Sequence, residues 1–157
     1  MRTLLASLSA LAVAGCAAGF GAASTGRPNA SAPAAAQASG TLTVRKSTYG
    51  RVLFDGRGKA LYAFTRDPKG GKSRCYGACA AAWPVYFAKG RLRAGKGVRP
   101  KLIGTTLRRD GKRQVTYNGR PLYYYVNDRR VGQIGCQNVA EFGGTWLVVR
   151  PNGHLVR

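Results

Sequence analysis

The chain has 157 residues, of which 26 are Lys or Arg and only 5 are Asp or Glu, so its formal net charge is +21. One histidine, five carboxylates and the absence of Gly-x-Ser-x-Gly, His-Glu-x-x-His, P-loop and Gly-x-Gly-x-x-Gly motifs argue against the common hydrolases, zinc proteases and nucleotide-binding enzymes. We therefore expect neither an enzyme nor a bound cofactor.

The first sixteen residues, MRTLLASLSALAVAGC, predict a bacterial lipoprotein signal peptide. Arg2 precedes an apolar run over residues 4–14, which is too short to cross a bilayer as a helix, since that takes about 20 residues. Val13-Ala14-Gly15 before Cys16 matches a lipobox, whose small side chains give the signal peptidase access. We expect residues 1–15 to be removed and Cys16 to carry a diacylglyceryl group, whose two chains suffice for stable attachment to the extracytoplasmic face of the cell membrane.

Residues 17–40 are almost wholly Ala, Gly, Ser, Pro and small polar residues, which cannot bury enough apolar surface to order the chain. Together with Cys16 they form a predicted lipidated tether over 16–40, in front of a domain at 41–157. Loss of Arg2 lowers the net charge from +21 to +20. Such a surface is either simply solvated or binds anionic lipids or cell-wall polymers. Export argues against nucleic acid as the partner.

The domain sequence predicts short strands joined by tight turns. Asn118-Gly119 between alternating runs is a strong hairpin signal, because both residues tolerate positive φ. The alanine-rich segment 76–83 predicts one short helix, which Pro84 ends. The expected strands are 41–45, 51–54 and 60–65 around a turn at 55–58, 114–117 and 121–126 around Asn118-Gly119, and 145–150 and 154–156 around Pro151-Asn152-Gly153.

An internal repeat with an offset of about 61 relates the two halves of the domain. Repeat 1 spans about 48–87 and repeat 2 about 105–157. We therefore predict a mainly β fold of roughly 8–10 strands, in which two related antiparallel hairpin units pack face to face in one small domain. Matched pairs include Gly58 and Gly119, Leu61 and Leu122, Tyr62 and Tyr123, Phe64 and Tyr125, Asp67 and Asp128, and Cys75 and Cys136.

Each repeat carries a Tyr-x-aromatic-x-x-Asp motif, at 62–67 and at 123–128. Residues i and i+2 of a strand share a face, so each tyrosine and the following aromatic lie side by side. In one reading the aromatics are core and the aspartates fix loops by accepting backbone N–H bonds. In the other, both copies line a ligand pocket about a pseudo-twofold axis. The candidate pocket residues are Tyr62, Phe64, Asp67, Tyr123, Tyr125, Asp128, Trp83 and Trp146.

Three cysteines remain in the domain, and extracytoplasmic cysteines tend to form disulfides. Cys75 and Cys79 can pair only if Gly77 interrupts the helix, because Cβ atoms four apart in a regular helix are too distant. Cys136 is the alternative partner of either one and would join the repeats. His154 follows a turn and is expected to be exposed, and its spacing from the cysteines is not that of a zinc module, so we predict no metal site.

At these residues the chain resembles the bacterial lipoproteins called "secreted repeat of unknown function", which carry a Tyr-x-(Phe/Trp/Tyr)-x-x-Asp motif. The resemblance implies an envelope location, tandem motif copies and pairing of Cys75 with Cys79, and it implies no established activity. Val85, where a second proline is expected, and Cys136 depart from the pattern. The segments that carry the resemblance are LYAFTRD at 61–67, CYGACAAAWP at 75–84, YNGRPLYYYVND at 117–128 and FGGTWLVV at 142–149.

These observations support two functional hypotheses. The first is a non-enzymatic module that binds an anionic component of the cell envelope through its cationic surface and aromatic residues. The second is an envelope redox or electron-transfer accessory that uses Cys75, Cys79 and the neighbouring tyrosines. The charge and the duplicated aromatics favour the first.

Overall fold

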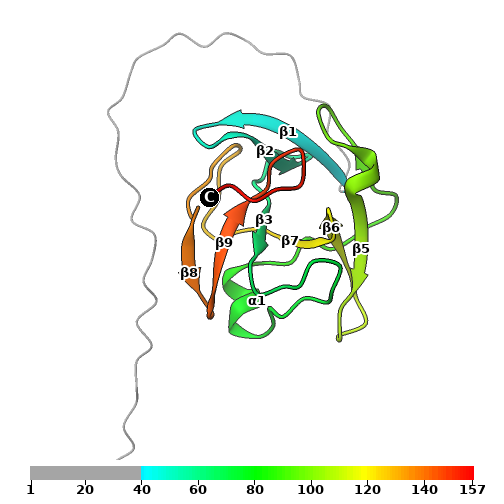
Figure 1. The fold of residues 1–157 in the computed structure, drawn as a ribbon, viewed down its shortest axis with the longest axis vertical. Helices are drawn as coiled ribbons and strands as arrows, with labels where there is room; N and C mark the ends of the chain where they lie inside the picture. The colour runs from blue at the N-terminus through cyan, green and yellow to red at the C-terminus, as the bar shows by residue number, and fades with distance from the viewer. Residues whose placement is uncertain (1–39) are drawn as a thin grey trace, which may run out of the picture.

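The computed structural model describes residues 40–157, so the predicted signal peptide, Cys16 and the tether up to residue 39 lie outside the described residues. Within residues 40–157, nine strands form two sheets (Figure 1). The three-stranded sheet has the order β2 (Gly50–Asp55), β1 (Thr41–Ser47), β4 (Arg93–Ala94). The six-stranded sheet has the order β5 (Ile103–Leu107), β6 (Arg113–Tyr117), β7 (Arg120–Tyr123), β3 (Tyr62–Phe64), β9 (Gly144–Val148), β8 (Val139–Glu141).

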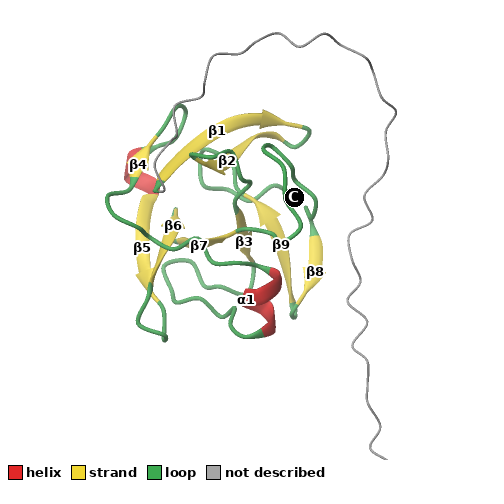
Figure 2. Ribbon diagram, turned by 180° about the vertical axis from the view of Figure 1, so that it is seen from behind, coloured by secondary structure: helices red, strands yellow, loops and turns green. Residues whose placement is uncertain are grey.

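The prediction of a mainly β fold is confirmed. The described chain contains one α-helix, α1 (Ala78–Ala82), and one 3-10 turn, at Pro100–Leu102. Figure 2 shows how little of the described chain is helical (red) beside strands (yellow) and loops (green). The predicted pairing of 51–54 with 60–65 is only partly right. β2 pairs along its whole length with β1, and it meets the second segment through a single bridge between Phe54 and Ala60.

The two repeats meet where β3 and β7 run antiparallel, with Tyr62 directly opposite its equivalent Tyr123. Equivalent residues facing one another in an antiparallel pair generate a local twofold axis. The units therefore do not pack face to face as expected, because β3 of repeat 1 lies between β7 and β9 of repeat 2 within one continuous sheet.

Tight turns explain both the predicted and the missed hairpins. Asn118 and Gly119 have φ of 51° and 72°, as expected for the β6–β7 turn. Phe142 and Gly143 have φ of 53° and 74° and close the β8–β9 hairpin, which was not predicted because a phenylalanine rarely adopts positive φ. The third predicted hairpin closes at Gly153, with a bridge between residues 149 and 155.

The sheet separates two apolar clusters, because alternate residues of a strand point to opposite faces. Leu61 and Ala63 lie in one cluster, while Tyr62 and Phe64 lie in the other. The second cluster also contains Cys79 of α1, so the helix covers this aromatic face. The motif residues predicted as a possible site thus belong to the core beneath α1.

Candidate functional site

The tyrosine of each repeat hydrogen-bonds the aspartate of the other repeat. Tyr62 donates its hydroxyl to Asp128 Oδ2 at 2.6 Å, and Tyr123 donates to Asp67 Oδ2 at 2.5 Å. All four side chains are buried. Because Tyr62 and Tyr123 are partners across β3 and β7, each hydroxyl reaches the loop that follows the opposite strand. The motif therefore braces the repeats against one another.

Each aspartate also fixes its own loop. Asp67 Oδ1 accepts the N–H of Arg74 at 2.7 Å, and Asp128 Oδ1 accepts the N–H of Gly135 at 2.8 Å, at positions again 61 apart. This is the backbone-binding role that the sequence predicted in its structural reading. Burial raises the pKa of each of these two carboxyl groups above the ordinary aspartate value. The hydrogen bonds that the carboxylates accept lower the pKa, but by less.

The aromatic side chains form a stack across the local twofold axis. The rings of Trp83 and Trp146 are parallel, with centroids 4.0 Å apart. Phe64 stacks on Trp146 at 4.2 Å and Tyr125 tilts against Trp83 at 4.8 Å, so the second aromatic of each motif contacts the tryptophan of the other repeat. Aromatic pairs at these separations add stability beyond the area that they bury.

The two tryptophans differ in their hydrogen bonding. Trp83 Nε1 donates to Glu141 Oε2 at 2.9 Å. In the described part of the chain, Trp146 Nε1 is the one buried side-chain polar atom without a hydrogen-bond partner. The helix α1 places no acceptor where β8 supplies Glu141, so the twofold relation breaks at this point.

All eight candidate pocket residues are thus brought together, but they form a packed core rather than the walls of an open shared pocket. Of these eight residues, only Tyr125 and Asp128 also border a cavity, whose volume is about 220 Å³. Lys59, Arg57 and Tyr124 line the same cavity. Sequence reasoning found the cluster through its repetition, and the buried geometry supports its structural role.

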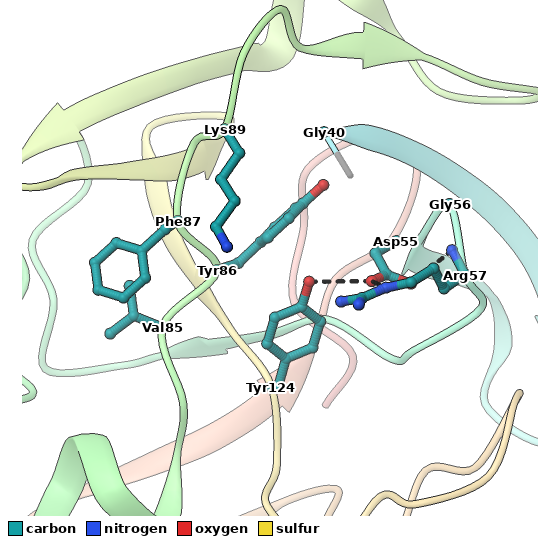
Figure 3. A pocket seen from close by; sticks show the side chains of 9 residues that line it. All are labelled: Gly40, Asp55, Gly56, Arg57, Val85, Tyr86, Phe87, Lys89 and Tyr124. Carbon is teal, nitrogen blue, oxygen red and sulfur yellow. Dashed lines mark hydrogen bonds and ion pairs between the residues drawn. The ribbon is translucent and has the colours of Figure 1, made fainter. Parts of the chain in front are cut away.

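A neighbouring cavity of about 170 Å³ shares Arg57 and Tyr124 with the previous one, so the two lie side by side. Figure 3 shows Tyr124 and Arg57 directed at Asp55, with Tyr86 beside them. Asp55 Oδ2 accepts from the Tyr124 hydroxyl at 3.1 Å and from Arg57 Nε at 3.2 Å. Burial raises the pKa of Tyr86 to about 12. Asp55 already neutralises Arg57. The remaining positive charge around the two cavities therefore comes from Lys59 and Lys89.

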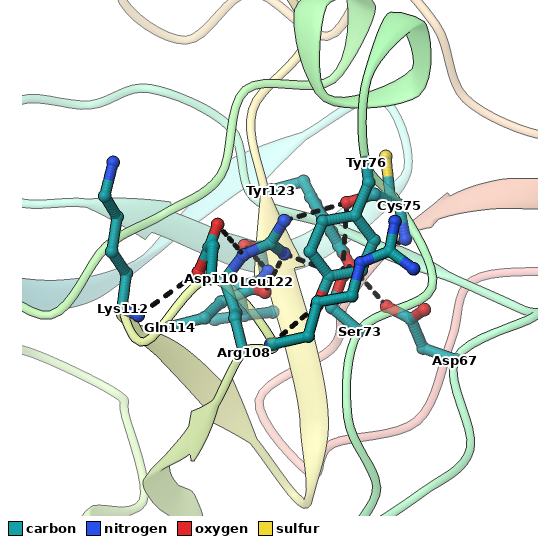
Figure 4. A network of polar contacts seen from close by, with 11 residues as sticks. Asp67, Ser73, Cys75, Tyr76, Arg108, Asp110, Lys112, Gln114, Leu122 and Tyr123 are labelled. Atoms are coloured by element: carbon teal, nitrogen blue, oxygen red, sulfur yellow. Dashed lines mark hydrogen bonds and ion pairs between the residues drawn. The ribbon is translucent and has the colours of Figure 1, made fainter.

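Sequence reasoning missed a buried arginine, Arg108, whose side chain is only 2% exposed. Its guanidinium donates to Ser73 Oγ at 2.7 Å, to Gln114 Oε1 at 2.8 Å and to the carbonyl of Cys75 at 2.9 Å, and it pairs with Asp110 at 3.3 Å. Figure 4 shows this network running on through Ser73 and Tyr123 to Asp67. Among 24 cationic residues of the domain sequence, nothing local distinguishes Arg108.

Charge on the domain surface is mostly positive because residues 40–157 hold 24 Lys and Arg against 5 Asp and Glu, and three of those five carboxylates are buried. All five acidic residues of the chain fall within residues 40–157, and each side chain accepts at least one hydrogen bond from the protein. Of the 24 Lys and Arg residues in that range, Arg57 and Arg108 form ion pairs and the others form none. The acidic residues are Asp55, Asp67, Asp110, Asp128 and Glu141.

Cys75 and Cys79 form a disulfide, with Cα atoms 5.3 Å apart. As the sequence required, Gly77 interrupts the local geometry at φ 54°, and the helix begins at Ala78. Both cysteines are buried, as is Cys136, which belongs to the same apolar cluster. A buried bridge offers an attacking thiolate little access, which weakens the redox hypothesis.

Among residues 40–157, no helix is long and apolar enough to cross a membrane. No group of three or more His, Cys, Asp or Glu side chains in this described range could hold a metal ion. His154 is exposed, as expected, and lines a basic surface depression with Arg120 and Arg157.

Comparison with known proteins found the same two-copy pattern. A family model described as "secreted repeat of unknown function" matches residues 43–86 and 104–150, that is, both repeats with their tyrosine–aspartate braces. No curated protein and no solved structure matches the chain. The two matches cover more than half of the sequence, and the chain belongs to this family of secreted repeat proteins.

Proposed function

We propose that this domain is a non-enzymatic binding module for an anionic component of the cell envelope, held at the extracytoplasmic face of the membrane by lipid on Cys16. The observation that carries the proposal is the commitment of all five carboxylates to internal hydrogen bonds, which leaves a surface of unpaired cations over residues 40–157. A surface of one sign attracts polymers and headgroups of the other sign over distances of about 10 Å at moderate ionic strength.

The family match supports the secreted location that this proposal needs. The lipobox at residues 13–16 supports attachment to the membrane, where anionic lipids and cell-wall polymers are concentrated. Three surface depressions of the domain are lined by Lys or Arg side chains and by no Asp or Glu, which is a lining that suits an anionic ligand.

The test is co-sedimentation of a chain that begins at residue 17, and so lacks the lipidated Cys16, with vesicles of phosphatidylglycerol and phosphatidylcholine, compared with vesicles of phosphatidylcholine alone. We expect retention on the anionic vesicles that falls steeply as salt rises from roughly 50 to 500 mM. Purified anionic cell-wall polymer is the parallel ligand. Absence of retention on both ligands, or retention that salt does not weaken, would refute the proposal.

A further inference from the structure

One surface pocket gathers more positive charge than its surroundings. It has a volume of about 460 Å³ and lies between the loop that follows β3 and the turn that joins β5 to β6. None of its four cations forms an ion pair within residues 40–157. The lining residues are Arg66, Lys72, Ser73, Arg74, Tyr76 and Arg109.

The carboxylates of the same two loops are directed elsewhere. Asp67 is buried and accepts from Tyr123 and from the backbone N–H of Arg74. Asp110 accepts from Arg108 and from the backbone N–H of Lys112. The pocket therefore keeps its positive charge available for a ligand.

Two of the pocket arginines are held in place by the protein. The Arg109 guanidinium lies 3.8 Å from the centre of the Tyr76 ring, and the Tyr76 hydroxyl accepts the Arg109 N–H at 3.1 Å. Arg66 Nη1 donates to the carbonyl of Phe142 at 3.0 Å. The buried Arg108 also contacts the Tyr76 ring, at 4.2 Å (Figure 4), and the disulfide of Cys75 fixes the adjoining backbone. Side chains held in this way lose less conformational entropy when a ligand binds.

Repeat 2 supplies an internal comparison. Its equivalent loop keeps the bracing Asp128, but Asn127 stands at the position of Arg66 and Gln133 at that of Lys72. Gln133 binds its own loop, accepting from the backbone N–H groups of Arg129 and Arg130 at 3.0 Å. The turn is thus built without the charges at positions 66 and 72, so the turn itself does not require them in repeat 1.

From this difference we infer that the pocket of Arg66, Lys72, Arg74 and Arg109 is a phosphate-binding site, which takes a phosphate group of an envelope lipid or polymer. Planar guanidinium groups match phosphate oxygens with paired hydrogen bonds. Four converging cations suit a group with several anionic oxygens better than a carboxylate, which has two oxygens and one charge. The inference rests on the proposed function and names the ligand chemistry of one site within it.

The test compares pyrophosphate with citrate, which carry similar charge near neutral pH, by titration calorimetry at fixed ionic strength on the same chain from residue 17. We expect pyrophosphate to bind about tenfold more tightly than citrate. The double variant Arg66→Asn/Lys72→Gln, which installs the repeat 2 residues, should lose about tenfold in pyrophosphate affinity, because charge-assisted hydrogen bonds disappear. Lys72→Gln alone, at an exposed side chain, should lose part of this affinity and serves if the double variant does not fold.

The matched control is Arg129→Gln/Arg130→Gln, which removes two exposed charges from the equivalent loop of repeat 2 and should change the affinity less than twofold. Retention on phosphatidylglycerol vesicles then distinguishes the sources: loss in the pocket variant identifies a lipid phosphate, and unchanged retention identifies a soluble or polymeric phosphate. Equal binding of pyrophosphate and citrate, or equal losses in pocket and control variants, would overturn the phosphate site while leaving the general polyanion proposal intact. No binding of any anion or vesicle would refute both.

Discussion

Repeat 1 and repeat 2 share their bracing residues but differ in the elements that come after the equivalent cysteines. After Cys75 the chain forms the disulfide-linked helix α1, whereas after Cys136 it forms the strand β8 and a hairpin to β9. The positive φ just before each element is shared, at Gly77 and Asn138. Alanines with a disulfide favour the helix, while Val139 and the Phe142-Gly143 turn favour the strand. The duplicated positions carry the fold, and the positions where the copies differ are where a specific ligand site is to be sought.

Among the tests of this comparison, substitution of the bracing tyrosines should change the free energy of unfolding most. Tyr123→Phe should lower the free energy of unfolding by about 3 kcal/mol, because Tyr123 bonds both Asp67 and Ser73. Tyr62→Phe should lower it by about 2 kcal/mol, because it removes one bond to a carboxylate. Urea unfolding followed by tryptophan fluorescence measures both values. A larger loss for Tyr62→Phe would show that the number of hydrogen bonds made by each tyrosine hydroxyl does not determine its contribution to stability.

Removal of the disulfide of repeat 1 should have a smaller effect than Tyr123→Phe, close to that of Tyr62→Phe. Cys75→Ala/Cys79→Ala opens a loop of only a few residues, since the cysteines are separated by 4 positions, and should cost about 2 kcal/mol. The same urea experiment measures the loss, and peptide mapping without reductant identifies the bridge. An unchanged midpoint would mean that α1 forms without it.

The two tryptophans sharpen the comparison within the core. Trp83→Phe removes the hydrogen bond to Glu141, while Trp146→Phe removes a buried N–H that has no partner in the described chain. With similar loss of packing, Trp83→Phe should be more destabilising by about 1 kcal/mol. Equal melting temperatures for the two variants would contradict this ranking.

The smallest effect concerns pH. In the unfolded chain Asp67 and Asp128 titrate near 3.8, and in the folded domain burial raises the pKa of both. Between these values the folded state binds more protons, so these two groups lower the free energy of unfolding as the pH rises above 3.8. Asp67→Asn/Asp128→Asn should flatten this dependence in urea titrations at a series of pH values. An identical slope in the variant would assign the effect to other groups.

Repetition made much of the fold predictable. The offset of 61 located the motif pairs, the Asn118-Gly119 turn located one hairpin, and Gly77 located the start of α1. The pairing partners were less accessible, because β3 is only three residues long and its neighbours β7 and β9 come from the far half of the chain.

The candidate site was only partly predictable, for a different reason. The motif residues were found, but a sequence pattern does not show that a tyrosine bonds the aspartate of the other copy rather than its own. Arg108 was missed because its burial depends on two acceptors that are distant in the sequence, on Ser73 and Cys75, as well as on the nearby Gln114. The pocket cations looked like an ordinary solvated surface until the loops of the two repeats were compared in space.

Because the tyrosine–aspartate hydrogen bonds run between the two copies, this architecture requires an even number of copies. One copy by itself holds a tyrosine without an aspartate and an aspartate without a tyrosine, so its core is incomplete. A chain with a single copy could complete both bonds only by associating with a second chain about a twofold axis, as in a symmetric dimer. Copies of this unit should therefore be gained and lost in pairs, and a fused pair such as this one is the covalent equivalent of that dimer.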